Sequence, residues 1–172
     1  MRAFDKQKGT VESAAREAMA LQESTNRLSI NARGAGQDFV DPTQLRREFE
    51  SVAVSTPGQN AQEISEAIQQ FVSLTGELKT GRESAGTFAT VASATGAGIG
   101  DVSSAAASIF NQFGLKSKDE MKDVMAILTF QGKKGAFEVK DMASQFQRLA
   151  AAGASFGLSG VKGVKTIGGL AQ

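Results

Sequence analysis

The chain has 172 residues, 41% of them apolar, and a formal net charge of +1 at pH 7. This length suits one folded domain, and so small a net charge exerts no strong overall pull on nucleic acid or membrane surfaces. Cysteine and histidine are both absent from the sequence, which excludes disulfides, thiolate metal sites and Ser-His-Asp or Cys-His catalysis within this chain. We therefore expect a protein that is not an enzyme.

The first predicted element is a long, weakly amphipathic helix over residues 5–33. Its apolar stripe is thin and mostly alanine. The stripe comprises Val11, Ala14, Ala15, Ala18, Leu21 and Leu28. Such a stripe predicts a helix that either pairs with another copy, in the manner of a coiled coil, or frays. Gly34 and Gly36 end it.

The next helix has a strong start signal. Asp41 is placed as the N-cap, Pro42 stands in the first turn, and Gln44 is placed to close a capping box. Leu45, Phe49 and Val52 form the predicted buried stripe, and the turn at residues 56–58 stops the helix. We interpret residues 1–58 as a polar N-terminal helical segment.

Residues 59–172 are interpreted as a compact Gly/Ala-rich helical region. It begins at Asn60, whose side chain is placed to cap a helix with Glu63 three residues later, and Ser117 with Glu120 forms a second capping box. Breaks are predicted at residues 75–81, 95–100, 113–117, 132–135 and 152–159. The runs between them carry apolar residues at helical spacing. These stripes are Ile64, Ala67, Ile68, Phe71 and Leu74; Val102, Ala105, Ile109 and Phe113; Met121, Val124, Met125 and Leu128; and Val139, Met142, Phe146 and Leu149.

A short motif occurs twice in this region. Phe113-Gly114-Leu115 recurs as Phe156-Gly157-Leu158, 43 residues later. The recurrence is either coincidence in a Gly/Ala-rich chain or the mark of stacked αα-hairpins. Both readings predict an all-α fold without strands: an array of short antiparallel, αα-hairpin-like helices with a longer N-terminal helix. The expected core anchors are Phe88, Phe110, Phe113, Phe130, Phe137, Phe146 and Phe156.

Acidic pairs and glycine-rich segments were weighed as sites. Asp119 and Asp123 are four residues apart with Glu120 beside them, but no calcium-loop pattern surrounds them, and acids in a first helical turn complement the helix dipole. Glu63/Glu66 and Glu48/Glu50 invite the same interpretation. Residues 160–166 end in Lys-Thr as a phosphate loop does, yet Val164 stands where that loop needs glycine. No catalytic, cofactor-binding or metal-binding residue is predicted, and no cofactor is expected.

The lysines of the C-terminal part were weighed as a nucleic-acid patch. They are Lys116, Lys118, Lys122, Lys133, Lys134 and Lys140. Such a patch needs aromatic side chains interleaved with the charges on one face. The nearby aromatics, Phe130 and Phe137, are assigned to the core, so DNA contact is not expected.

The order of several motifs resembles a known family. Gly132-Lys133-Lys134-Gly135-Ala136-Phe137 leads into an Ala-rich run around Phe146 and then Phe156-Gly157-Leu158-Ser159-Gly160, while Ala94-Thr95-Gly96-Ala97-Gly98 and Phe113-Gly114-Leu115 lie upstream. Over roughly residues 60–172 this resembles the conserved region of phage tail tape measure proteins. Because family members are much longer and continue beyond this point, we expect a fragment or a split prophage copy.

The resemblance implies a structural component of phage tail assembly that scaffolds polymerisation of the tail tube and helps to set tail length. It implies a location in the virion, inside the tail lumen, after synthesis in the bacterial host cytoplasm. The implied partners are the tail tube protein, tail assembly chaperones and further copies of the chain; membrane contact is expected only of the full-length parent. The alternative is a stand-alone helical binding module, an assembly chaperone or a helical effector that offers apolar grooves to a partner helix.

Overall fold

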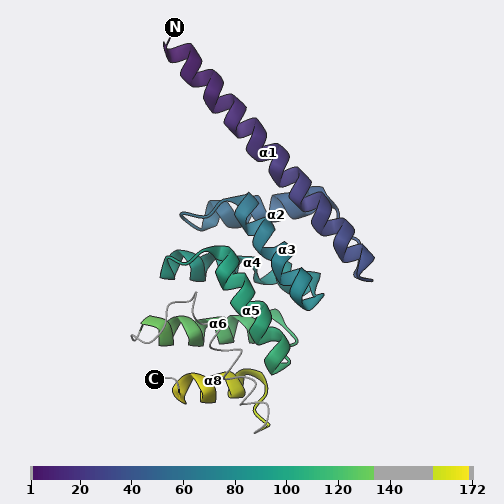
Figure 1. Ribbon diagram of the computed structural model, residues 1–172, viewed down its shortest axis with the longest axis vertical. Helices are drawn as coiled ribbons and strands as arrows, with labels where there is room; N and C mark the ends of the chain where they lie inside the picture. Colours follow the sequence, from purple (N-terminus) through teal and green to yellow (C-terminus); the bar gives the residue numbers. More distant parts are fainter. Residues whose placement is uncertain (1, 134–156, 171–172) are drawn as a thin grey trace.

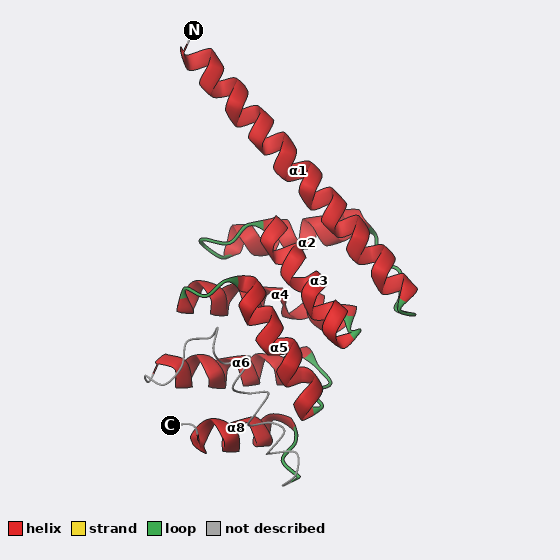
Figure 2. Cartoon of the chain, in the orientation of Figure 1, coloured by secondary structure: helices red, strands yellow, loops and turns green. Residues whose placement is uncertain are grey.

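A computed structural model describes residues 2–133 and 157–170 of the chain (Figure 1). These residues form seven α-helices, and no strand occurs among them (Figure 2). The all-α prediction is therefore confirmed. The helices are α1 (Arg2–Gly34), α2 (Pro42–Ser55), α3 (Ala61–Thr75), α4 (Leu78–Thr95), α5 (Ile99–Phe113), α6 (Lys118–Lys133) and α8 (Gly160–Leu170).

The helices stack in two rows. In Figure 1, α1, α3 and α5 run diagonally and follow one another down the molecule, while α2, α4, α6 and α8 lie across them. Each helix contacts the next but one, as α3 contacts α5 and α4 contacts α6, and consecutive helices such as α3 and α4 also touch. This is the arrangement of stacked αα-hairpins, in which each hairpin covers the apolar side of its neighbour.

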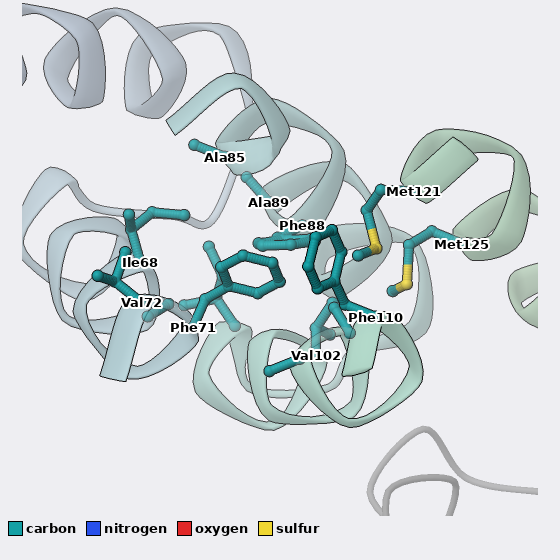
Figure 3. Packing of buried hydrophobic residues seen from close by; sticks show 14 of the residues in the cluster. Ile68, Phe71, Val72, Ala85, Phe88, Ala89, Val102, Phe110, Met121 and Met125 are labelled. Carbon is teal, nitrogen blue, oxygen red and sulfur yellow. The ribbon is translucent and has the colours of Figure 1, made fainter. Parts of the chain in front are cut away.

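The core lies between the rows and is centred on Phe71 of α3. Its ring centroid lies 5.5 Å from that of Phe88 in α4 and 5.6 Å from that of Phe110 in α5. Figure 3 shows Met121 and Met125 of α6 closing this group beyond Phe110. Aromatic side chains bury the largest apolar area available to this chain, so three adjoining helices are held together at one point.

The predicted helix starts are largely confirmed. The Asn60 side chain accepts a hydrogen bond from the backbone N–H of Glu63 at 2.8 Å. The Ser117 hydroxyl accepts one from the N–H of Glu120 at 3.2 Å, and the Glu120 carboxylate accepts the N–H of Lys116 at 2.7 Å. These bonds satisfy donors that the first helical turn otherwise leaves free, which is why the two starts were readable from sequence.

The start of α2 differs from the prediction in one respect. Asp41 caps the helix as expected, accepting the N–H of Thr43 at 2.8 Å, and Pro42 occupies the first position. Gln44 does not close a capping box with it; its amide donates to Glu48, one turn further on, at 2.8 Å. Glu48, four residues further along the same helix, competes for the Gln44 side chain that the capping box would use.

The glycines of the repeated motif share a backbone conformation. Gly114 ends α5 with φ 62°, and Gly157 precedes α8 with φ 70°, so both glycines adopt the left-handed conformation that favours this residue. After Gly114 the N–H of Leu115 bonds to the carbonyl of Phe110 at 3.0 Å, and the Leu115 side chain is buried. Each of these glycines lies shortly before a helix of the second row, α6 or α8. The interpretation of the motif as a repeat stays a prediction. Phe156 lies outside the described residues.

Most of the predicted core is confirmed. Phe88, Phe110 and Phe113 are buried, as are the stripes of α5 and α6 where they are described. Two predictions were wrong. Leu74 is 51% exposed because it lies at the margin of its stripe in the last turn of α3. Phe130 is 61% exposed, since it follows the buried Met121 by about two and a half turns and so faces the opposite side of α6. The anchors Phe137 and Phe146 lie outside the described residues.

The helix boundaries also correct the sequence analysis at three glycines. Gly81 lies inside α4, Gly100 inside α5 and Gly132 inside α6, although each was assigned to a break. At Gly81 the reason is close packing: a Cβ there would lie 3.0 Å from Cδ1 of Phe71. A glycine that admits a neighbouring side chain looks the same in sequence as one that ends a helix. The division between residues 1–58 and 59–172 stays a prediction.

Only the second half of α1 belongs to the stack. Leu21, Leu28 and Ala32 are buried against the following helices, whereas residues 11–19 are exposed throughout. In Figure 1 the N-terminal half of α1 extends well past the rest of the chain. The helix has 33 residues, which corresponds to about 50 Å at 1.5 Å per residue. We call residues 2–20 the arm.

Candidate functional site

The acidic pairs are separate surface features. Asp119 and Asp123 are exposed on α6, and Glu63 and Glu66 are exposed on α3. Across residues 2–133 and 157–170, no three acidic side chains gather into a group that could hold a metal ion. Glu120, the third acid near Asp119, caps its own helix, and Glu63 and Asp119 lie in first helical turns, where an acidic side chain complements the helix dipole.

Glu48 of α2 has a different role, because it joins two helices of the second row. Its carboxylate accepts two hydrogen bonds from the Arg82 guanidinium of α4, at 2.6 and 3.0 Å, and one from Gln44. Burial alone would raise the pKa of Glu48, but the bonds from Arg82 and Gln44 and the charge of Arg82 together lower it. A bidentate pair of this kind fixes the orientation of α2 on α4.

The segment that ends in Lys-Thr is helical. Residues 160–166 form the first turns of α8, whereas a phosphate-binding loop needs a run of free backbone N–H groups. Gly163 is instead a packing residue: a Cβ there would lie 3.0 Å from Cδ1 of Phe113 and 3.0 Å from the carbonyl carbon of Leu158. The segment lets α8 approach α5 closely.

The lysines are brought together only in part. Lys116, Lys118 and Lys122 are exposed around the start of α6. Lys134, Lys140 and Phe137 lie outside the described residues, as does the side chain of Lys133. The described lysines stand beside the exposed Asp119 and Asp123, so this stretch of α6 has mixed charge, which is typical of a solvated helix surface.

Among the clefts on the described surface, two differ clearly in the chemistry of their linings. One, of about 650 Å³, lies where the loops before α3 and α5 meet; it is lined by glycines and by Glu63, Glu66 and Gln70. The other, of about 520 Å³, is a groove between α4 and α6 with an apolar lining that includes Val91, Ala94 and Ala126. The first offers two carboxylates and an amide, and the second offers space for an apolar side chain or helix face.

Most of the exposed large apolar side chains among the described residues belong to the N-terminal part of the chain, a feature that the sequence analysis did not foresee. Among the described residues, five of the seven large apolar side chains that are exposed belong to α1, α2 and the loop between them. They are Val11, Met19, Ile30, Phe39 and Val54.

The part of the chain that the structure describes is thus a stack of short helices with a projecting helical arm. Its described surface carries an apolar groove between α4 and α6 and several exposed apolar side chains of α1 and α2. Among the helices described, none is long and apolar enough to cross a membrane.

A comparison with protein families agrees with this class. The family model for phage-related minor tail proteins matches residues 48–172, well over half of the chain. The chain belongs to the phage-related minor tail protein family. No curated protein and no solved structure matches it. Membership indicates a structural role in the phage tail and a place in the virion. The match begins within α2, so the arm lies outside the region on which the family assignment rests.

Proposed function

We propose that this chain is a segment of a tail tape measure protein, which scaffolds polymerisation of the tail tube and helps to set tail length. The observation that carries the proposal is the family match over residues 48–172. The arm supports it, because a projecting single helix converts residues into length at about 1.5 Å each. The chain would act in the tail lumen after synthesis in the host cytoplasm, without catalysis and without a cofactor, against the tail tube protein and assembly chaperones.

Tail length, measured by electron microscopy, tests the proposal. Deleting residues 2–19 in frame from the phage gene removes 18 residues, or about five helical turns, and leaves the buried residues of α1 from Leu21 onward in place. We expect tails about 27 Å shorter, rounded to whole rings of the tube, and equally longer tails when the block is duplicated.

The control is Ser13→Lys, which changes the exposed surface of the arm without changing its length. Its tails should keep the parental length. Deletion and duplication that both leave tail length and infectivity unchanged would contradict a ruler role for this segment. They would select the alternative, a stand-alone helical binding module, for which the apolar groove between α4 and α6 is the favouring observation.

A further inference from the structure

The side of α1 that packs on the stack is only partly apolar. Among the described side chains of α1, three of the six that are buried carry a hydroxyl group. The six are Leu21, Ser24, Thr25, Leu28, Ser29 and Ala32. The buried residues of α3 and of α5 include one hydroxyl side chain each, Ser65 and Ser103. Because burial of apolar area is the main source of cohesion between helices, α1 is attached less firmly than α3 and α5 are to each other.

The surface that α1 covers is more apolar than α1 itself. Leu28 belongs to the same buried cluster as Leu45 and Phe49 of α2 and Ile64 and Ile68 of α3, and all five side chains are fully buried. Helix α1 contacts both α2 and α3. Separation of α1 from the stack would therefore give solvent access to an apolar surface of α2 and α3.

The hydroxyl groups of α1 make this separation less costly. Thr25 donates to the carbonyl of Leu21 in its own helix at 2.9 Å, and this bond persists when α1 moves away as a helix. The Ser24 and Ser65 hydroxyls lie 2.7 Å apart across the boundary between α1 and α3. Water can replace such a bond with little net change in free energy, whereas it cannot replace a lost apolar contact.

The rest of the stack is held by contacts that do not include α1. The Phe71 ring of α3 packs against rings of α4 and α5. Arg82 of α4 donates two hydrogen bonds to Glu48, which hold α2 on α4. In a stack where each helix contacts only its near neighbours, an outermost helix can separate while the others stay folded.

We propose that α1 is a releasable cover: it opens as one unit while α2 to α6 stay folded, and its opening controls access to the apolar surface of α2 and α3. The proposal stands on the packing of α1 and does not depend on the tail role.

Labelling of buried thiols tests the proposal in the full chain, which has no cysteine of its own. Ser65→Cys and Ser103→Cys each place one thiol at a fully buried position. Ser65 lies against α1, whereas Ser103 lies between α3 and α5 and donates to the carbonyl of Ala67. In urea below the unfolding transition, the Ser65→Cys thiol should react with a small disulfide reagent at least about tenfold faster than the Ser103→Cys thiol.

The urea dependence of labelling separates opening of α1 from global unfolding. Opening of α1 exposes less surface, so the Ser65→Cys rate should rise less steeply with urea than the Ser103→Cys rate. Unfolding midpoints from circular dichroism verify that both variants are folded and correct the rates for any difference in stability. Equal corrected rates with equal urea dependence would show that α1 opens only when the whole stack unfolds, and would overturn the proposal.

A disulfide between α1 and α3 provides a second, independent test. Because the Ser24 and Ser65 hydroxyls are in contact, the Ser24→Cys/Ser65→Cys variant should form this bond when oxidised. Hydrogen exchange at the amides of residues 21–32 should then slow toward the rate of the α3 and α5 amides. The reduced form of the same variant is the matched control and should exchange like the parent. A disulfide that leaves this exchange unchanged, or one that does not form, would contradict the proposal.

Discussion

Two glycines in one helix should respond oppositely to the same substitution. Gly81 and Gly86 both lie inside α4, and neither has a positive φ. A Cβ at Gly81 would lie 3.0 Å from Cδ1 of Phe71 and 3.5 Å from Cγ2 of both Ile68 and Val72. At Gly86 nothing lies within 4 Å of the added carbon. The pair therefore separates the backbone effect of alanine from its packing effect.

The magnitudes follow from those contacts. Alanine in a helix interior is favoured over glycine by about 0.5–1 kcal/mol, so Gly86→Ala should stabilise the protein by about that amount. Gly81→Ala gains the same stabilisation from helix propensity. Its extra methyl group, however, contacts the Phe71 ring, which is fully buried between Phe88 and Phe110 and so has no free space to move into. Overpacking of a core costs about 1–3 kcal/mol, which leaves Gly81→Ala roughly 1 kcal/mol less stable than the parent.

Urea unfolding followed by far-ultraviolet circular dichroism measures both variants against the parent. At an unchanged slope, the midpoint should rise for Gly86→Ala and fall for Gly81→Ala. In thermal unfolding the Gly81 variant should lose about 2–4 °C. If Gly81→Ala proves as stable as Gly86→Ala, Phe71 has room to move, and the close contact between α3 and α4 does not hold them in place.

Other substitutions test the core, a cap and the ion pair. Phe71→Ala should cost about 3–5 kcal/mol in urea unfolding, because the ring fills the centre of the core; Asn60→Ala should cost about 1 kcal/mol by the same assay, through loss of the cap on α3. Because Arg82 and Gln44 hold the pKa of Glu48 below its ordinary value, its stabilising contribution is present above that ordinary value and is lost as the pH falls through the lowered one. Glu48→Gln should therefore be less stable than the parent at neutral pH, and the difference should vanish in acid; unfolding midpoints across a pH series check this.

The sequence predicted what depends on nearest neighbours along the chain. The caps at Asn60 and Ser117 and the stripes of α3, α5 and α6 involve residues within one or two turns of each other, so spacing was sufficient to find them. Which helix packs on which was not predicted in detail, because contacts such as α3 with α5 join segments separated by a whole helix. Gly81 was misread for the same reason, since its role is set by Phe71 of the preceding helix.

The search for chemical motifs in the sequence did not locate the surfaces that distinguish this chain. No residue was predicted to form a site. The structure instead shows exposed apolar side chains such as Met19 and Ile30, whose exposure cannot be predicted from amino-acid composition. A stripe of apolar residues predicts which side of a helix packs against another helix. It does not indicate whether that other helix belongs to the same chain. Along α1 the apolar stripe continues from Val11 to Ala32, yet from Leu21 onward it is covered by α2 and α3, whereas residues 11–19 are exposed. The two parts of the stripe differ because α2 and α3 pack against only one of them, and that packing is a property of the tertiary fold. For this reason the arm, more than any motif, is where a contact with a second molecule should be sought.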